Sequence, residues 1–570
     1  MVYVDFLKTK KYKINPIGMD IKNSDINEKL FPFQKDIVKW AVKKGRCAIF
    51  LDTGLGKTFI QLEWARILGK NTLIVAPLSV ARQTIREGKK IGITVNYVRS
   101  MEEVKEGINI TNYEIIENFD ENRFDCIVLD ESSILKSITG KTRQKLIDKF
   151  KTIKYKLCCT ATPAPNDYIE LGNHTEFLGI CTRQEMLSMF FINANLEHTF
   201  EVNGKLYTEK GSNKGGQEWR LKHHAEEAFF EWMTKWSITM IYPSDLGYND
   251  EGFKLPLLNI KPIYIKTKFN STDRLFFDGL HGIEDRVNLR KDTSKEKIGI
   301  IKDLVSQNGT QWIVWCGLDI ESTLAVNNLK DAREIKGTDD NEYKATSFEE
   351  FQDNKYKTCI TKIKIGGFGM NFQNCSNMVF FGLNDSWEMY YQAVRRCWRF
   401  GQKKEVNVYV ILSEYEREIF ENIQRKDLQA RRLREKMIEK LKDLEKGEIK
   451  GMEIEREEYN TEEVKGKNFT AYLGDSCEFL KKIKDSSIDL SVYSPPFMDL
   501  FVYSNSNRDI GNCRNPEEFY NHYEFIVQQI FRATKEGRIS CVHTSDIPAM
   551  ANRDGYIGLK DFPGEVLRLH

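Results

Sequence analysis

Short runs of apolar residues recur along the first third of the chain, between Arg46 and about Thr160. The runs read CAIFL, TLIVAP, CIVLD and YKLCCT, and stretches that can form helices separate them. Uninterrupted apolar runs of this length, alternating with helices, are typical of parallel strands whose sheet is covered on both faces. The pattern predicts an α/β unit over residues 31–185.

The same rhythm returns in the second half of the chain. The runs there are WIVWC (312–316), TCITKI (358–363), MVFFGL (378–383) and VNVYVIL (406–412). They predict a second α/β unit over residues 263–419. Residues 186–262 break the rhythm, and we expect an insertion there. The insertion is rich in aromatic residues: Phe190, Phe191, Trp219, Phe229, Phe230, Trp232 and Trp236.

Two further segments follow the second unit. In residues 420–466, apolar side chains recur at helical spacing in a highly charged background: Leu433, Met437, Leu441 and Leu444. We expect an amphipathic connecting helix there, followed by an acidic, flexible linker, EIEREEYNTEE. A third α/β pattern occupies residues 467–570. Residues 1–30 are polar and carry no strong structural signal, so we expect an N-terminal extension.

Length, charge and cysteine content limit the classes of protein. At about 150 residues per domain, 570 residues predict three or four domains. The net charge of +2, from 85 Lys and Arg against 83 Asp and Glu, excludes a globally basic nucleic-acid coat but does not exclude a local basic patch. No apolar run approaches the roughly 18 residues of a membrane helix, and we see no signal peptide. Twelve scattered cysteines without a C-x-x-C pair indicate reduced thiols and a cytoplasmic location.

A glycine-rich loop, DTGLGKT (52–58), follows the first apolar run and precedes a helical stretch. A strand, such a loop and a helix N-terminus bind phosphate, because backbone N–H groups and the helix dipole favour anions. Lys57 would reach the β- and γ-phosphates, and the Thr58 hydroxyl would ligate magnesium. The expected nucleotide-binding residues are Thr53, Gly54, Gly56, Lys57 and Thr58. The strict pattern has Gly where this chain has Leu51, and the alternative is a chance glycine turn.

An acidic pair ends a later apolar run, in VLDES (128–132). Asp130 at a strand end can hold magnesium together with Thr58. Glu131 beside it can orient or deprotonate the attacking water. The alternative is a solvated loop, but an acidic pair at this distance after a phosphate loop favours the catalytic interpretation.

The second α/β unit supplies cations. In QAVRRCWRFGQ, Arg396 and Arg399 are three residues apart, so on a helix they share one face. Guanidinium groups aimed at a γ-phosphate stabilise the charge of the transition state, and the alternative is ordinary surface charge. A glycine loop, GGFGMN (366–371), precedes the arginines. Its Gly367 and Gly369 would let the backbone approach a nucleotide.

Taken in order, these motifs resemble those of a superfamily-two DNA translocase of the Swi/Snf helicase type, over residues 31–415. The resemblance is carried by FPFQ, DTGLGKT, LIVAP, ITNY, DESS, TATP, GGFGMN and QAVRRCWRFGQ. It implies two RecA-like domains that close on ATP and Mg²⁺ and track along DNA, duplex more than single-stranded. It also implies that Gln34 reads adenine and that Arg396 and Arg399 are arginine fingers. The threonines of TATP would relay the nucleotide state to the other domain.

In such a fold, loops at one end of both sheets grip a DNA backbone. The candidate contacts are Arg82, Gln83, Thr111, Asn112 and the GGFGMN loop. Contacts to phosphate carry no sequence information, so we expect salt-sensitive, sequence-tolerant binding. The aromatic insertion at 186–262 is either a wedge that enters the duplex or a small hydrophobic core.

In the third segment, an apolar strand pattern ends in SPPF, and its four residues are candidate catalytic residues. The Ser494 hydroxyl and the Pro495 carbonyl can accept hydrogen bonds from an exocyclic amino group of a base. The two prolines, Pro495 and Pro496, fix the backbone there. Phe497 can stack on a base turned out of the helix. The alternative is a common Ser-Pro-Pro turn after a strand.

Residues 468–570 as a whole resemble the N-terminal part of a DNA amino-methyltransferase of phage or mobile-element type, in which the catalytic motif precedes the cofactor motif. The resemblance implies a partial Rossmann-like domain, with Asp475 and Asp546 as polar contacts. The F-x-G-x-G motif that grips S-adenosylmethionine is absent, so we expect a fragment, a split gene or a remnant. S-adenosylmethionine would bind only if the missing C-terminal half were supplied. We therefore predict that this chain alone does not methylate DNA.

These observations leave three functions to compare. The first is a DNA-dependent ATPase motor, a translocase or helicase, linked to an incomplete DNA methyltransferase module. The second is the motor subunit of a restriction-modification or phage-defence system, whose nuclease or methyltransferase would be a partner chain. The third is a nucleotide-gated DNA clamp without turnover. An enzyme is favoured over the clamp by the presence of Lys57, Asp130, Glu131, Arg396 and Arg399.

Overall fold

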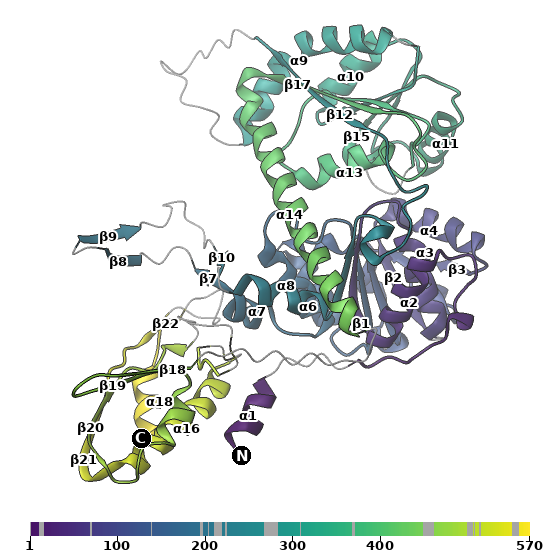
Figure 1. Ribbon diagram of the computed structural model, residues 1–570. Coiled ribbons are helices and arrows are strands. Elements are labelled where there is room, and N and C mark those ends of the chain that lie inside the picture. The colour runs from purple at the N-terminus through teal and green to yellow at the C-terminus, as the bar shows by residue number, and fades with distance from the viewer. Residues whose placement is uncertain are drawn as a thin grey trace. The chain divides into compact units, whose positions relative to one another are not determined.

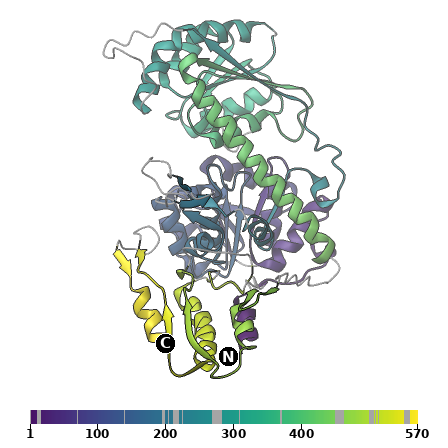
Figure 2. The same cartoon turned by 60° about the vertical axis from the view of Figure 1, so that its left-hand side comes forward.

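The computed structural model divides into two compact units, traced from two directions in Figures 1 and 2. It describes residues 2–10, 16–68, 71–137, 140–193, 198–202, 205–209, 219–222, 225–266, 283–307, 309–366, 371–448, 461–498, 506, 508–511, 513, 515–549 and 558–570. Unit 1 comprises Met1–Asn15, Leu171–Lys235 and Asp443–His570. Unit 2 comprises Pro16–Glu170 and Trp236–Lys442.

Unit 2 contains two sheets, and the first has the strand order β11-β1-β6-β5-β2-β4-β3. Its strands are β1 (Arg46–Leu51), β2 (Thr72–Ala76), β3 (Val95–Tyr97), β4 (Ile108–Asn112), β5 (Cys126–Asp130), β6 (Tyr155–Cys159) and β11 (Ser237–Met240). Every neighbouring pair is parallel. Its helices are α2 (Pro32–Lys44), α3 (Lys57–Leu68), α4 (Leu78–Lys90) and α5 (Lys141–Lys149). We call this sheet with its helices lobe 1 (Figure 1).

The central strands of lobe 1 are buried along their whole length. All residues of β2, β5 and β6 are buried, as are those of β1 after Arg46. Ile60 and Trp64 of α3 belong to the same buried core as Ile49 of β1 and Ile74 of β2. This two-sided burial is the physical reason why these strands read as uninterrupted apolar runs in the sequence.

The edge strand β11 comes from the stretch that the sequence predicted as an insertion. It pairs in parallel with β1, and Ala48 lies opposite Ser237. Trp236, directly before β11, is fully buried, and its ring centroid lies 6.0 Å from that of Phe50. The range 186–262 is therefore not one separate insertion, because its later part completes the lobe 1 sheet.

The second sheet of unit 2 has the strand order β12-β17-β16-β13-β15-β14, and all its pairs are parallel. Its strands are β12 (Leu258–Ile265), β13 (Trp312–Cys316), β14 (Ala332–Ile335), β15 (Thr358–Lys362), β16 (Asn377–Phe380) and β17 (Val406–Ser413). Its helices are α9 (Ile283–Ser306), α10 (Asp319–Asn328), α11 (Asn341–Gln352), α12 (Ile363–Gly366) and α13 (Trp387–Cys397). We call this sheet with its helices lobe 2. The predicted α/β class with two parallel-sheet domains is confirmed.

Helix α14 (Arg417–Glu448) covers most of the segment that the sequence predicted as a charged helical linker. Near its start, Phe420 and Ile423 belong to the core of lobe 2. Further on, Leu441 belongs to the core of lobe 1, and the Thr239 hydroxyl of β11 donates to the Met437 sulfur at 3.3 Å. The part of α14 up to Lys442 is therefore integral to unit 2, because its apolar face is buried against both lobes.

Unit 1 includes a group of short elements between the lobes in sequence: α6 (Leu171–Leu178), α7 (Arg183–Phe190), β7 (Phe191–Asn193), β8 (His198–Val202), β9 (Lys205–Glu209), β10 (Trp219–Leu221) and α8 (Glu226–Thr234). The ring centroid of Phe190 lies 5.4 Å from that of Phe229 and 5.1 Å from that of Trp232. All three side chains are buried. These aromatic residues form a hydrophobic cluster and are not exposed as a wedge would be.

The C-terminal part of unit 1 is a second small α/β assembly. The strands β20 (Ile488–Tyr493) and β21 (Thr534–Val542) pair in parallel. Two antiparallel pairs accompany them: β18 (Glu462–Lys465) with β19 (Thr470–Leu473), and β22 (Ile547–Ala549) with β23 (Gly558–Lys560). The helices are α15 (Ser476–Leu480), α16 (Pro516–Ala533) and α18 (Phe562–Leu569). A buried core joins α16, α18 and the loop after β20.

The N-terminal extension contributes a helix to this assembly. Helix α1 (Tyr3–Lys10) buries Tyr3, Phe6 and Leu7 in one cluster with Cys477 of α15. The Tyr3 hydroxyl donates to Asp475 Oδ2 at 2.8 Å. The first residues of the chain are therefore part of unit 1, although the sequence carries no strong signal for them.

Two properties hold for the described residues generally. None of their helices has the length and apolarity needed to cross a membrane. All twelve cysteines are free, and all except Cys541 are buried.

Candidate nucleotide site

The loop predicted to bind phosphate lies between β1 and α3, at the carboxyl end of the lobe 1 sheet. Leu51, where the strict pattern has Gly, is the last residue of β1 and is fully buried in the sheet. Gly54 and Gly56 have φ of +93° and +82°, which other residues rarely adopt. A Cβ on Gly54 would lie 2.8 Å from Cβ of Phe400, and a Cβ on Gly56 would lie 2.3 Å from the Gln34 amide nitrogen. Both positions therefore require glycine.

Lys57 and Thr58 begin α3, where free backbone N–H groups and the helix dipole favour an anion. The Lys57 ammonium donates to the backbone oxygens of Leu51, at 2.9 Å, and Asp52, at 3.4 Å. Burial lowers the pKa of Lys57, and nearby carboxylates, that of Glu131 most strongly, oppose the shift. The lysine is held within the loop, where a positive charge can meet bound phosphate.

The predicted magnesium ligand Asp130 is the last residue of β5 and is buried. One carboxylate oxygen accepts from the Gln61 amide of α3 at 2.9 Å, and the other accepts from the backbone N–H of Glu131 at 3.1 Å. Burial raises the pKa of Asp130, and Gln61 and Lys57 oppose the rise. The side chain is thus fixed at the sheet edge, next to the phosphate loop.

The predicted catalytic glutamate, Glu131, is held in an unusual conformation. Its backbone is left-handed, with φ 56° and ψ 52°. Its Oε2 atom is buried and has no hydrogen-bond partner in the described part of the chain. Burial raises the pKa of Glu131 to about 7, although Lys57 and Arg396 oppose the rise. An unpaired carboxylate oxygen with a pKa near neutrality fits a general base for water.

Gln34, which the resemblance assigns to adenine, lies in the first turn of α2 and is buried. Its amide nitrogen donates to the backbone oxygen of Leu55 at 2.9 Å. Its amide oxygen accepts from the backbone N–H of Phe31 at 2.9 Å. Both ends of this side chain bind backbone groups, so it ties the start of α2 to the phosphate loop. Its role toward adenine stays a prediction.

The two predicted arginine fingers come from lobe 2. Arg396 lies on α13 and donates to the Gln392 side chain at 2.7 Å. Burial lowers its pKa to about 10, and the nearby Glu131 carboxylate of lobe 1 opposes the shift. Arg399 follows α13 and donates to the Asn371 side-chain oxygen. Burial lowers its pKa to about 9, and the charge of Arg396 lowers it further. Arg396 is therefore close enough to Glu131 of lobe 1 to interact with its charge.

The two lobes also touch through the TATP motif. The Thr162 hydroxyl donates to the Glu388 carboxylate of α13 at 3.3 Å, and Lys136 of lobe 1 forms an ion pair with the same Glu388. The backbone N–H of Thr162 donates to the Thr160 hydroxyl at 3.1 Å. This chain of contacts joins the end of β6 to the helix that carries Arg396, as a relay between the lobes requires.

The arrangement fits a magnesium nucleotide. The loop and the start of α3 supply donors for phosphate, and Thr58 and Asp130 supply oxygen ligands of the kind Mg²⁺ prefers. Magnesium in such sites takes its other ligands from phosphate and water, so a larger acidic cluster is unnecessary. Within the described residues, no group of three or more His, Cys, Asp or Glu side chains could hold a metal ion. Gly367 and Gly369, predicted to approach the nucleotide, lie outside the described residues.

The four side chains proposed for DNA contact differ in exposure. Arg82 and Gln83 lie on α4; Arg82 is exposed, and Gln83 donates to Glu87 of the same helix at 2.7 Å. Thr111 at the end of β4 is fully buried, and Asn112 is also buried. Only the two α4 residues are therefore open to a DNA backbone in this conformation.

The SPPF motif lies directly after β20, as the sequence predicted. The Ser494 hydroxyl is exposed and donates to the backbone oxygen of His543 at 3.0 Å. Pro495 is buried and Pro496 is half-buried. The ring centroid of Phe497 lies 6.2 Å from that of His543. The motif thus presents one hydroxyl and a partly exposed aromatic ring at the carboxyl end of a parallel strand pair.

The two aspartates assigned to the methyltransferase-like segment have different surroundings. Asp475 is buried, caps α15 through the backbone N–H of Cys477 at 2.8 Å and accepts from Arg508 at 2.8 Å. Asp546 is exposed. Asp475 therefore has structural partners of its own, and Asp546 is open to solvent.

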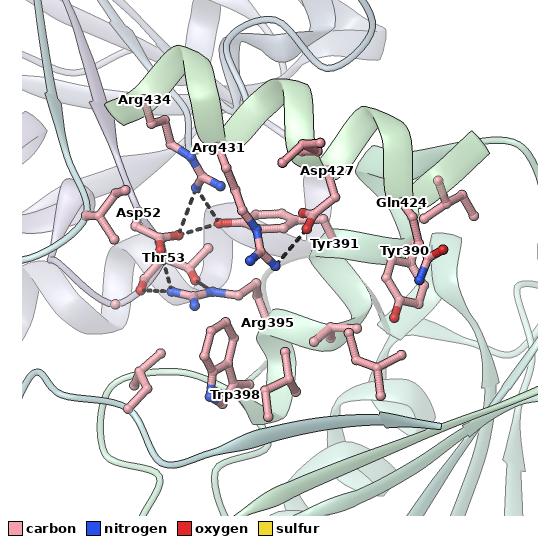
Figure 3. Close-up of a pocket in the computed structure, with 18 of the residues that line it drawn as sticks. Asp52, Thr53, Tyr390, Tyr391, Arg395, Trp398, Gln424, Asp427, Arg431 and Arg434 are labelled. Atoms are coloured by element: carbon pink, nitrogen blue, oxygen red, sulfur yellow. Dashed lines mark hydrogen bonds and ion pairs between the residues drawn. The ribbon is translucent and has the colours of Figure 1, made fainter. Parts of the chain in front are cut away.

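A set of side chains on the other flank of the phosphate loop was not predicted from the sequence. Asp52 in the loop contacts Arg395 and Tyr391 of α13 and lies near Arg434 of α14 (Figure 3). These residues line a cavity of about 570 Å³ bounded by the loop, β12, α13 and α14. Arg395 is visible in QAVRRCWRFGQ, but nothing local marks its partner. Arg434 is one of many charges on an amphipathic helix, so no sequence signal singles it out.

The fold and the site define the class of protein. Residues 33–190 match the family model of the SNF2-related domain, and residues 296–401 match that of the helicase conserved C-terminal domain. The second match lies in lobe 2, and the first covers most of lobe 1. Together the two matched domains indicate an ATP-hydrolysing enzyme of the DNA helicase and translocase class. The predicted enzyme class, an ATP hydrolase of the DNA helicase and translocase type, is confirmed.

The chain is similar to curated relatives at low identity. The chain is 22% identical over 440 residues to the DNA annealing helicase and endonuclease ZRANB3 of Bos taurus, covering 69% of this chain and 39% of that protein. It is 28% identical over 173 residues to the SWI/SNF-related matrix-associated actin-dependent regulator of chromatin subfamily A-like protein 1 of Xenopus tropicalis, covering 28% of this chain and 18% of that protein. The chain thus spans well under half the length of these relatives.

A solved structure is similar over a comparable range. The Sulfolobus solfataricus SWI2/SNF2 ATPase core in complex with dsDNA aligns with 69% of this chain and 90% of that chain, at 17% identity and a TM-score of 0.34. The fold class is defined by the strand orders of the two sheets.

Proposed function

We propose that this chain is an ATP-driven motor that moves along DNA, with duplex DNA as the preferred track. The observation that carries the proposal is the contact between the two lobes at α13, the helix that carries Arg396. The Thr162 hydroxyl and the Lys136 ammonium of lobe 1 both bind Glu388 of that helix. Catalytic groups supplied by two lobes make turnover depend on the position of the lobes. Turnover and lobe movement are then linked, as a motor requires.

Each residue has one task in this proposal. The loop N–H groups and Lys57 would bind the phosphates, and Thr58 and Asp130 would hold magnesium, which when bound neutralises phosphate charge. The free oxygen of Glu131 accepts a proton from the attacking water. Arg396 and Arg399 stabilise the charge that develops on the γ-phosphate.

The choice of DNA as the track has two supports. The relatives are named as a DNA annealing helicase and as a SWI/SNF-related regulator of chromatin. Arg82 is an exposed cation on α4, the helix after β2, where phosphate contact would be independent of sequence. Duplex preference follows from the resemblance to Swi/Snf-type translocases, many of which move without separating strands.

The test is steady-state ATP hydrolysis without DNA, with single-stranded DNA and with duplex DNA. We expect duplex DNA to stimulate turnover most, and Glu131→Gln to lower kcat by about 100-fold or more because no base remains for the water. The matched control is Glu117→Gln, since that side chain is half-exposed and pairs with Lys145 at 2.8 Å. Stronger stimulation of turnover by single-stranded DNA would contradict the duplex translocase and indicate a strand-separating helicase. Nucleotide binding without hydrolysis under any condition would favour the DNA clamp.

A second proposal concerns the C-terminal part of unit 1, as the base-recognition part of a DNA amino-methyltransferase. It is supported by the exposed Ser494 hydroxyl and the ring of Phe497 at the carboxyl end of β20. A hydroxyl acceptor beside an aromatic ring can bind the amino group of an extruded base and stack on its face. The alternative is a motor subunit that works with a separate methyltransferase or nuclease chain. That alternative assigns the same roles to the motor residues.

Fluorescence of 2-aminopurine tests this second proposal. The probe is a duplex with one 2-aminopurine opposite an abasic site, so that the base is already poorly stacked. We expect the chain to quench the probe by stacking, and Phe497→Ala to remove most of the quenching. Phe531→Ala is the control, because Phe531 is an 83% exposed aromatic residue in the same part of the chain. Equal quenching by both variants would exclude stacking on Phe497.

A further inference from the structure

Asp52 is a phosphate-loop residue whose carboxylate is committed to other side chains. It is buried, and one oxygen accepts from the backbone N–H of Thr53 at 2.7 Å. The other lies 3.1 Å from a guanidinium nitrogen of Arg395. The Tyr391 hydroxyl donates to the carboxylate, and Arg434 lies 3.9 Å from it. We call Asp52, Tyr391, Arg395 and Arg434 the Asp52 cluster (Figure 3).

Arg395 joins α13 directly to the loop. Its Nε atom donates to the Thr53 hydroxyl and its Nη2 atom to the Thr53 backbone oxygen at 2.9 Å. The guanidinium also lies 4.8 Å from the ring centroid of Trp398. Only 3% of the Arg395 side chain is exposed. Three contacts to two consecutive loop residues fix both the position and the orientation of this side chain.

Arg434 brings α14 to the same point. Its Nη1 atom donates to the Tyr391 hydroxyl at 3.3 Å, and its guanidinium lies 5.6 Å from the Tyr391 ring centroid. Only 9% of its side chain is exposed. One turn earlier on α14, Arg431 pairs with Asp427 at 2.7 Å, and 56% of its side chain is exposed. Of these two arginines, Arg434 alone reaches the loop.

The charges of the cluster depend on one another. Burial alone would raise the pKa of Asp52, but Arg395 and Arg434 hold the pKa below its usual value, so the carboxylate stays ionised. Breaking a buried ion pair by removing one partner leaves an uncompensated charge, whereas removing both partners often costs little. The cluster should therefore respond very differently to single and double substitutions.

The position of Arg395 in the sequence gives the cluster a consequence for catalysis. The next residue on α13 is Arg396, the predicted finger that interacts with Glu131. Because Arg395 is fixed to Thr53, the loop that binds phosphate and the helix that carries Arg396 cannot shift independently. We propose that the Asp52 cluster positions the phosphate loop against α13 and α14, and that Arg395 and Arg434 are positioning residues for ATP turnover. This inference rests on the proposed ATPase function.

The first measurement separates turnover from binding. For Arg395→Met we expect kcat to fall about tenfold or more, while the Kd for the fluorescent analogue mant-ATP changes less than about threefold, since the loop N–H groups and Lys57 remain. Arg434→Met should lower kcat by less, about three- to tenfold, because its distance to Asp52 is longer. Arg431→Met is the matched control and should stay within about twofold of the unmodified chain. A purely structural role would lower the number of mant-ATP sites and leave kcat per site unchanged.

The second measurement uses the mutual dependence of the charges. Asp52→Asn should impair turnover, and the double variant Asp52→Asn/Arg395→Met should be less impaired than the product of the single effects predicts. Equal mant-ATP affinities across the series would support a positioning role. Additive losses, or turnover by Arg395→Met and Arg434→Met at the unmodified rate, would overturn it.

The third measurement does not depend on hydrolysis. Amide hydrogen exchange of the peptide that covers residues 52–58 should become faster in Arg395→Met and Arg434→Met but not in Arg431→Met. If the unmodified chain fails to hydrolyse ATP, the proposed function fails, and the exchange pattern still decides whether the cluster positions the loop. Unchanged exchange in all three variants would exclude the positioning role.

Discussion

At the scale of single residues, Glu131 has two energetically unfavourable features. Its left-handed backbone is unfavourable for a residue with a side chain, by about 1–3 kcal/mol, and its carboxylate is buried with one oxygen unpaired in the described structure. Such strain persists only where surrounding contacts impose it, here the end of β5 and the fixed Asp130. The strain has a use, because it holds an uncommitted oxygen next to the phosphate loop.

The raised pKa of Glu131 predicts the pH dependence of turnover. The group acts as a base, so only its ionised form is active, and that form predominates above a pKa of about 7. We expect kcat/KM for ATP to rise with pH through about 7 and to level off above it, because this ratio reports the free enzyme. Phosphate groups titrate nearby, with a second pKa of about 6, so the residual activity of Glu131→Gln is the reference. The same rising limb in that variant would assign the titration to another group.

Site residues that belong to a contiguous motif were predictable from the sequence. Residues on other elements that hold those site residues in place were not. DTGLGKT and VLDES identified Lys57 and Asp130 because a loop or strand end presents consecutive residues to one ligand. Gln61, which fixes Asp130, and Arg434, which reaches Asp52, sit on helices among similar residues. Their partners are set by packing, and no local pattern encodes it.

At the scale of elements, the apolar runs were sufficient for strands covered on both faces. The strands that the sequence did not single out are the polar or short ones, such as β4 and β14. In β4, Asn109 is fully buried because its amide bonds to the backbone of Lys105, so a polar residue occupies a core position. Such strands are recognised by their neighbours in the sheet and not by their own composition.

One contact between elements of lobe 2 is fully buried and charged. Lys297 of α9 donates to Glu416 Oε2 at 2.6 Å, and neither side chain has any exposed area. The same carboxylate oxygen accepts from the backbone N–H of Ser413 at 2.7 Å and from its hydroxyl at 3.0 Å. The pair therefore joins α9 to the turn between β17 and α14.

Substitution of this pair should be strongly asymmetric. Lys297→Met leaves the Glu416 carboxylate buried without its cation, and we expect it to destabilise lobe 2 by about 3–5 kcal/mol. Lys297→Met/Glu416→Gln removes both charges and should be less destabilised than the single variant. Thermal unfolding followed by calorimetry measures both effects. The control is Lys295→Met, an exposed position on the same helix, and an equal loss there would show that the pair is not the cause.

At the scale of the whole molecule, the order of segments in space departs from their order in the chain. The predicted succession of units treated residues 186–262 as one insertion and residues 420–466 as a linker. Strand β11 instead forms one edge of the lobe 1 sheet, and α14 up to Lys442 is packed into unit 2. Both differences have the same cause. In each, segments distant in sequence come together through side chains that no local sequence pattern distinguishes.

Among these contacts, the one between the segments farthest apart in the sequence is made by α1. This contact has a consequence for protein synthesis. Lys10 Nζ contacts His522 Nδ1 at 3.1 Å, across a separation of 512 residues. At about 5–20 residues per second, the ribosome needs roughly 25–100 s to add them. For that time Phe6 and Leu7 of a nascent chain lack the surface that covers them. Helix α1 is therefore made long before the residues that cover it, so its burial marks a chain that has been translated through His522.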